Sequence, residues 1–113
     1  MNDEKTRTIQ RLNDEFRYSG GKKGHGRLMI TEGVFALPLE TQFAIVAKVQ
    51  AYSDFNEGND PYGEHDFGTV SHKGAKVFWK FDYYNRYMSA GSEDPADPEA
   101  TSRVLTIMLA REY

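Results

Sequence analysis

The residues best suited to chemistry are three consecutive polar side chains, Glu64, His65 and Asp66, together with Asp82 further along the chain. A histidine beside carboxylates can serve as a general base at neutral pH. Histidine and carboxylate oxygens are also a ligand set for transition metals. However, no nucleophile accompanies this pattern and no spaced pair of histidines supports a metal-binding helix. We therefore favour structural roles: a cross-strand pair of His65 with Asp82, and Asp66 capping backbone N–H groups.

The elements that position these residues form a predicted β-hairpin. Phe67–His72 has the length of a strand, and side chains alternate from Lys76 to Tyr84. Between them, Lys73–Gly74 suits a two-residue turn, because glycine readily takes the positive φ that such turns need.

The register of this hairpin follows from the turn. A two-residue turn places Gly68 opposite Trp79, so that the large indole meets no side chain. Three pairs further from the turn, His65 lies opposite Asp82. A three-residue turn would shift the register and reverse the two faces.

Alternation gives the second predicted strand two different faces. One face carries Val77, Trp79, Phe81 and Tyr83 and is the predicted core face. The other is mixed aromatic and polar, and with the preceding loop it supplies the predicted binding residues: Glu64, His65, Asp66, Phe78, Lys80, Asp82 and Tyr84. Stacking of Tyr83, Tyr84 and Tyr87 on a base, with Lys76 and Lys80 near phosphate, is the nucleic-acid alternative.

The remaining pattern predicts an α+β fold, a small antiparallel sheet packed on its Trp79 face by two or three helices. Leu39, Phe43, Val46 and Ala47 form one apolar stripe of the middle helix, widened by Ile45, Val49 and Tyr52. Asp97 as an N-cap and Pro98 in the first turn are residue types favoured at the start of a helix, so they predict the last helix. The predicted helices are about Asp3–Tyr18, Pro38–Tyr52 and Pro98–Glu112, with further strands at Arg27–Thr31 and Arg86–Ser89.

Length and composition limit the classes of protein to consider. A chain of 113 residues with a formal net charge of −3 fits one folded domain, 1–113. It has no cysteine, which excludes disulfides, thiolate nucleophiles and cysteine-ligated zinc. We find no signal peptide and no apolar run long enough to span a membrane, so a cytoplasmic location is the expectation.

Charge is unevenly distributed along the chain. The loop Asp54–Asp66 has five acidic residues and no Lys or Arg, but it matches the calcium-loop pattern poorly. Met1–Arg27 has seven Lys or Arg against four Asp or Glu. Any nucleic-acid contact would therefore come from Arg7, Arg11, Lys22 and Lys23 and would weaken with salt. The glycine-rich loop Gly20–Gly26 lacks the Lys-Ser/Thr of a phosphate-binding loop and is a predicted connection.

Several phrases of the sequence resemble a family of small bacterial proteins known only as a domain of unknown function. They are EHDFG from Glu64, FWKFDYYNRYM from Phe78 and the closing TSRVLTIMLAREY, with RLNDEFR and TEGVFALP upstream. The resemblance implies a stand-alone domain often found in proteobacterial genomes and plasmids. It implies no catalytic residue and no assigned activity.

Three classes of function stay open. The favoured one is a small binding or regulatory module that contacts a protein, rather than nucleic acid or a membrane, through the mixed face and the acidic loop. A metal-dependent or His–Asp hydrolase at the loop–hairpin junction is the second, and a structural accessory protein is the third. We expect no cofactor, and the sequence does not indicate a small-molecule ligand.

Overall fold

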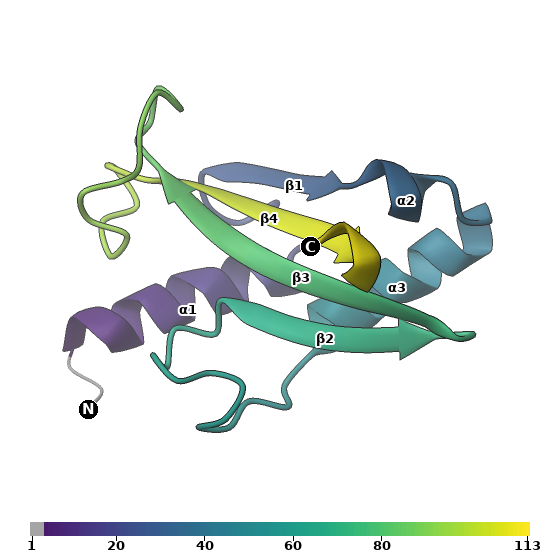
Figure 1. The fold of residues 1–113 in the computed structure, drawn as a ribbon. Coiled ribbons are helices and arrows are strands. Elements are labelled where there is room, and N and C mark those ends of the chain that lie inside the picture. The colour runs from purple at the N-terminus through teal and green to yellow at the C-terminus, as the bar shows by residue number, and fades with distance from the viewer. Residues whose placement is uncertain (1–3) are drawn as a thin grey trace.

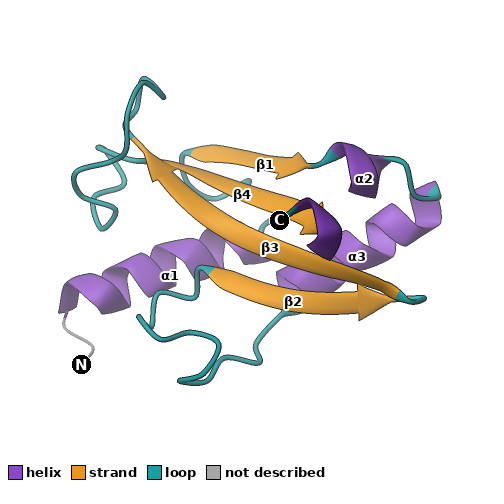
Figure 2. Cartoon of the chain, viewed as in Figure 1, coloured by secondary structure: helices purple, strands orange, loops and turns teal. Residues whose placement is uncertain are grey.

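The computed structural model describes residues 4–113, and it shows helices on one side of a single four-stranded sheet (Figures 1 and 2). The strand order is β1-β4-β3-β2, with β1 parallel to β4 and the other neighbours antiparallel. The predicted α+β class is thus confirmed, but the sheet is mixed rather than antiparallel, because β1 runs parallel to β4. The elements are α1 (Glu4–Tyr18), β1 (Gly26–Ile30), α2 (Glu32–Phe35), α3 (Leu39–Ala51), β2 (Phe67–His72), β3 (Ala75–Tyr84), β4 (Ser102–Leu109) and the 3₁₀ turn η1 (Ala110–Glu112).

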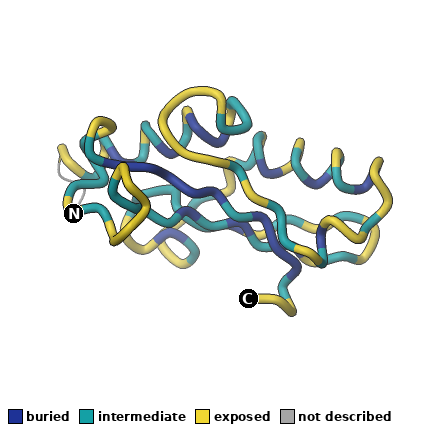
Figure 3. Tube along the Cα trace, turned by 90° about the horizontal axis from the view of Figure 1, so that it is seen from above, coloured by how far each residue is buried: buried dark blue, intermediate teal, exposed yellow. Residues whose placement is uncertain are grey.

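The two long helices lie behind the sheet in Figure 1 and cover what we call its inner face. Phe16 of α1 and Ile45 of α3 join Trp79 of β3 and Ile107 of β4 in one core, and all four are fully buried. Within residues 4–113, the opposite, outer face carries no α-helix, although η1 folds back over part of it (Figure 2). Viewed from above, exposed loops surround this buried centre (Figure 3).

The β2–β3 hairpin has the predicted register. Gly68 pairs with Trp79 and Val70 with Val77. Lys73 and Gly74 have φ of 49° and 83°, and positive φ at both positions is the signature of a type I′ turn. A Cβ on Gly68 would lie 2.5 Å from the indole Nε1 of Trp79. Glycine is therefore required here for space, as the register predicts.

The predicted last helix, Pro98–Glu112, is wrong. Residues 102–109 form the strand β4, which lies between β1 and β3. Its inner side chains, such as Leu105, and its outer ones, such as Val104, are both buried. A strand buried on both faces gives a nearly continuous apolar run, which a short sequence window does not distinguish from a helix.

Two smaller predictions need correction. In α3, Leu39 and Phe43 of the predicted stripe are 64% and 67% exposed. Ile45 and Val49, which were predicted to widen that stripe, are buried, together with Thr41. Arg86–Ser89 is a turn rather than a strand, because the Asn85 carboxamide oxygen accepts hydrogen bonds from backbone N–H groups within it. The strand expected at Arg27–Thr31 is β1. The first helix agrees with α1, and Asp3, its predicted start, lies outside the described residues.

Glu112 ties η1 to the start of α2. Its carboxylate accepts hydrogen bonds from the Thr31 hydroxyl at 2.6 Å, the Gly33 N–H at 2.9 Å and the Leu109 N–H at 2.8 Å. The hydrogen bond from Thr31 is the main cause that lowers the pKa of Glu112. One exposed carboxylate thus joins two segments that are far apart in the sequence.

Candidate functional site

The seven predicted site residues do not form one cluster. Glu64 and His65 face α1, on the helix side of the sheet. Phe78, Lys80, Asp82 and Tyr84 project from β3 on the outer face, as the alternation of the strand predicts. Asp66 lies where the loop meets β2 and lines a groove that reaches the outer face. The predicted site therefore mixed residues from two separate surfaces, the helix side and the outer face of the sheet.

The predicted His65–Asp82 pair is wrong. The His65 Nδ1 atom lies 2.9 and 3.0 Å from the two carboxylate oxygens of Asp14 on α1, and its Nε2 lies 3.7 Å from Asp60. Asp82 pairs instead with Lys80 of its own strand, at 2.8 Å. The hydrogen bond from the Phe81 N–H to the Asp66 carbonyl is the last one between the two strands of the hairpin, so His65 is not paired with β3.

The backbone of His65 has the conformation that ends the hairpin. Its φ is 56°, a region that residues other than glycine rarely occupy. Its N–H donates to the Asp60 carboxylate at 3.1 Å, and its ring stacks on Phe55 with centroids 3.7 Å apart. A pocket of about 620 Å³ lies beside this ring, between the acidic loop and Gln10 of α1. Since α1, the loop and the hairpin all meet at His65, it fixes the path of the loop.

Glu64 takes part in a buried polar network. Its carboxylate accepts a hydrogen bond from the Tyr83 hydroxyl at 2.9 Å, and Asn13 donates to that hydroxyl at 2.8 Å. Arg103 donates to the Asn13 side-chain oxygen at 2.7 Å and to the Pro95 carbonyl. Burial raises the pKa of Tyr83 and lowers that of Arg103. With its polar groups joined in this way, the network links α1, β3 and β4.

A second network contains Arg17, which the sequence reasoning missed. The Arg17 side chain is fully buried, with Nη1 3.1 Å from Asp14, and Nε and Nη2 donating to the Val49 and Tyr52 carbonyls at the end of α3. Its guanidinium carbon lies 4.9 Å from the Trp79 ring centroid and 5.4 Å from that of Phe55. The sequence did contain a signal for the burial of Arg17. Positions 9, 13, 16 and 17 of α1 lie on one side of the helix, and this buried stripe includes polar residues.

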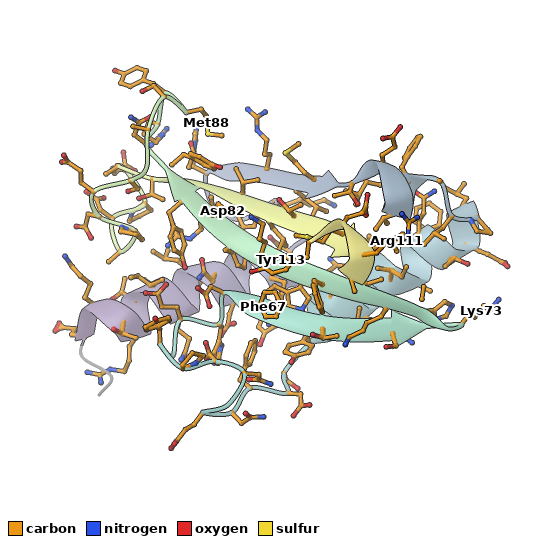
Figure 4. All side chains as sticks on the ribbon, in the orientation of Figure 1. Phe67, Lys73, Asp82, Met88, Arg111 and Tyr113 are labelled. Carbon is orange, nitrogen blue, oxygen red and sulfur yellow. The ribbon has the colours of Figure 1, made fainter. Side chains whose placement is uncertain are left out.

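The side chains that lie open to a ligand line a groove of about 390 Å³, which we call the outer groove. Its lining includes the rings of Tyr62, Phe67 and Tyr113 and the charged groups of Asp66, Lys80 and Asp82. Figure 4 shows Phe67, Asp82 and Tyr113 on the face of the sheet that is turned away from α1 and α3. Three of the predicted residues thus meet here, while Tyr62 and Tyr113 were not predicted.

The aromatic rings of the outer groove differ in exposure. Phe67 packs against Phe78 and Tyr113, with ring centroids 5.3 and 6.0 Å apart, and the rings of Phe78 and Tyr113 meet edge to face at 5.5 Å. Tyr62 and Tyr113 are 75% and 74% exposed. Exposed aromatic side chains gathered around a concave surface are a common feature of binding sites. Tyr84, by contrast, lies further along β3, opposite Ser102.

The charged groups of the groove are unequally paired. The side-chain hydrogen bond with Asp82 raises the pKa of Lys80. The Asp66 carboxylate forms no ion pair with any residue in 4–113. Burial, followed by the nearby charge of Glu64, raises the pKa of Asp66. An ionised Asp66 therefore lies in a site that disfavours negative charge, without a cation of its own.

In the described part of the chain, no group of three or more His, Asp or Glu side chains is arranged to hold a metal ion. None of the helices in this part is both long and apolar enough to cross a membrane. A family model described as "Protein of unknown function (DUF3768)" matches residues 30–112. The phrase RLNDEFR, from Arg11 to Arg17, lies before this match. No curated protein matches the chain, and no solved structure does.

Proposed function

Because the chain belongs to the DUF3768 family, whose description assigns no activity, we propose from its geometry that it is a small protein-binding module. The contact surface in this proposal is the outer face of the sheet, centred on the outer groove. The proposal is carried by two exposed rings, Tyr62 and Tyr113, beside the carboxylate of Asp66, which has no ion-pair partner in the described part of the chain. They lie on the face of the sheet opposite α1 and α3.

The charge of the outer groove favours a protein over a nucleic acid. Its lining has two carboxylates, Asp66 and Asp82, and one ammonium group, Lys80. Phosphates bind where positive charge accumulates, so this surface would repel a nucleic-acid backbone. The aromatic and polar composition resembles that of protein interfaces, whose centres are enriched in tyrosine and depleted of lysine. A regulatory role and a location in the cytoplasm stay predictions.

The proposal is tested by capturing partners from a lysate, with and without nuclease, on wild-type protein and on three variants. Tyr62→Ala and Tyr113→Ala shorten exposed groove residues, so neither should unfold the protein. Tyr87→Ala is the matched control, because Tyr87 is 89% exposed and does not line the groove. We expect a partner that survives nuclease and Tyr87→Ala but is lost with the groove variants. Equal capture by all four proteins, or loss with nuclease, would overturn the proposal.

A second candidate function rests on the contact between His65 and Asp14. A carboxylate at Nδ1 orients an imidazole for general-base work, and His65 lines the pocket of about 620 Å³. The test is the hydrolysis of p-nitrophenyl acetate and of bis(p-nitrophenyl) phosphate. Activity that is lost in His65→Gln and kept in His72→Gln would support a hydrolase. Equal rates in the two variants would rule it out.

A further inference from the structure

Asp66 is the residue of the outer groove whose charge is not balanced. Lys80 is bonded to Asp82, and among residues 4–113 no cation lies within ion-pair distance of Asp66. Burial raises the pKa of Asp66, and the charges of Glu64 and Asp60 raise it further, while His65 acts in the opposite direction. A partly buried carboxylate near other carboxylates is costly unless a cation neutralises it. The groove therefore has electrostatic complementarity to a cation.

The rings of the groove restrict the shape of that cation. Tyr62, Phe67 and Tyr113 present aromatic surfaces, and the outermost two are exposed on about three quarters of their area. A flat guanidinium stacks on such rings and can give two parallel hydrogen bonds to one carboxylate, whereas an ammonium group is a compact, strongly hydrated charge. The combination of rings and carboxylate fits arginine better than lysine.

The protein already holds one arginine in this way. The guanidinium of Arg17 is bonded to the Asp14 carboxylate and lies 4.8 to 5.4 Å from the ring centroids of Tyr18, Phe55 and Trp79. The outer groove offers the same kinds of partner, aromatic faces and a carboxylate. In the described chain its carboxylate, Asp66, has no guanidinium.

We propose that the outer groove binds an arginine side chain of a partner polypeptide, with its guanidinium between the rings of Tyr62 and Tyr113 and bonded to Asp66. This inference rests on the proposed protein-binding function and names the chemistry of the partner. The aromatic rings hold the plane of the guanidinium, and the carboxylate sets its orientation. Lysine, which lacks the planar fork, binds more weakly at the same place.

Asp66 also gives a readout that separates a binding role from a structural one. Because the pKa of Asp66 is raised in the folded state, its ionised carboxylate destabilises the fold at every pH above that folded-state pKa. The destabilisation disappears below the pKa of the unfolded chain, about 3.9. Asp66→Asn removes the charge at neutral pH. The variant therefore melts at the same or a higher temperature than wild type near pH 7, while its arginine binding weakens.

The binding test is an NMR titration of the protein with N-acetyl-arginine amide, followed through backbone amide shifts. We expect saturable shifts at the residues of the outer groove, with N-acetyl-lysine amide binding more weakly and N-acetyl-glutamine amide giving none. In Asp66→Asn, the arginine affinity falls about tenfold or more, as for a lost hydrogen bond between charged groups. Asp54→Asn is the matched control, since it removes the same charge from the same loop but does not line the groove.

Three results would overturn the inference. They are equal binding of the arginine and lysine amides, equal weakening by Asp54→Asn and Asp66→Asn, and a lower melting temperature of Asp66→Asn. Each leaves the protein-binding function open, because a partner lost with Tyr62→Ala but kept with Asp66→Asn would still bind the face. Conversely, saturable arginine binding stands even if the capture experiment finds no partner.

Discussion

Arg17 is the side chain whose removal should separate the two long helices most directly. Methionine at this position keeps much of the volume but removes every donor. The end of α3 loses hydrogen bonds of 3.1 and 2.8 Å to the carbonyls of Val49 and Tyr52, and Asp14 loses its partner at 3.1 Å. Removing one member of a buried ion pair typically costs about 3–5 kcal/mol, because the other charge stays buried. We expect Arg17→Met to lose about this much stability, toward the lower end because His65 still contacts Asp14.

The measurement is urea unfolding followed by the fluorescence of Trp79, the single tryptophan, whose ring centroid lies 4.9 Å from the guanidinium carbon. Arg11→Met is the matched control on the same helix. Its ion pair with Glu15 is exposed, and such pairs contribute about 0.3–0.5 kcal/mol. Arg17→Lys keeps the charge but cannot give three donors in the same plane, so its stability should lie between those of the wild type and Arg17→Met.

A loss for Arg17→Met within about 1 kcal/mol of the loss for Arg11→Met would refute this reasoning, given errors of a few tenths for such comparisons. It would mean that the two carbonyls find other donors and that the aromatic contacts, rather than the hydrogen bonds, hold the helices together. A fluorescence maximum unchanged in native Arg17→Met would also argue against the placement of the guanidinium beside Trp79.

Three further predictions concern the sheet and its ends. Trp79→Ala should cost about 3–5 kcal/mol, because the indole is fully buried, and an unchanged melting temperature would contradict its place in the core. Gly68→Ala should cost about 1–3 kcal/mol in urea unfolding, because its Cβ would collide with Trp79, whereas Gly91→Ala, with its nearest atom 3.9 Å away, should be neutral. Glu112 has a lowered pKa, so its contribution to stability is present above the unfolded pKa of about 4.3 and is lost as pH falls through the folded value. Glu112→Gln should therefore melt below wild type at pH 7 and approach it as the pH falls through the lowered folded pKa of Glu112, and a constant difference in melting temperature would exclude this role.

The hairpin could be predicted from the sequence because its signals are local. Alternation fixed the faces of Phe78 and Trp79, and the turn at Lys73–Gly74 fixed the register. Both the period and the turn chemistry act within a few residues. Prediction succeeded where short-range rules decide the outcome.

The strand β4 could not be predicted in this way. A cap at Asp97 and apolar residues at helical spacing favoured a helix, and the Asp97 side chain does accept a hydrogen bond from the Glu99 N–H, but within a turn. The choice between helix and strand depends on β1 and β3, which offer hydrogen-bonding edges on both sides of residues 102–109. Those edges are distant in the sequence, and tertiary context overrides local propensity.

The candidate site was predicted in part for a similar reason. The alternation of side chains along β3 correctly predicted that Lys80 and Asp82 lie on the outer face. It could not show that the positive φ of His65 ends the pairing of the two strands before His65 reaches Asp82. The partner of His65 is Asp14, 51 positions earlier. Likewise, Tyr62 and Tyr113 meet in one groove only because the acidic loop and η1 return to the same edge of the sheet.

The central place of β4 has a consequence for the order in which the protein can fold. Gly26 of β1 pairs with Arg103, 77 positions later, and among the described strands β4 is the only neighbour of β1. Until residues 102–109 are available, α1, α3 and the β2–β3 hairpin can meet, but β1 has no strand partner among the described residues and the edge of β3 stays open. The sheet is complete only when residues 102–109 form β4 between β1 and β3. Since such long-range pairing is slow and leaves unpaired edges exposed, the chain is most prone to aggregation before β4 pairs with β1 and β3.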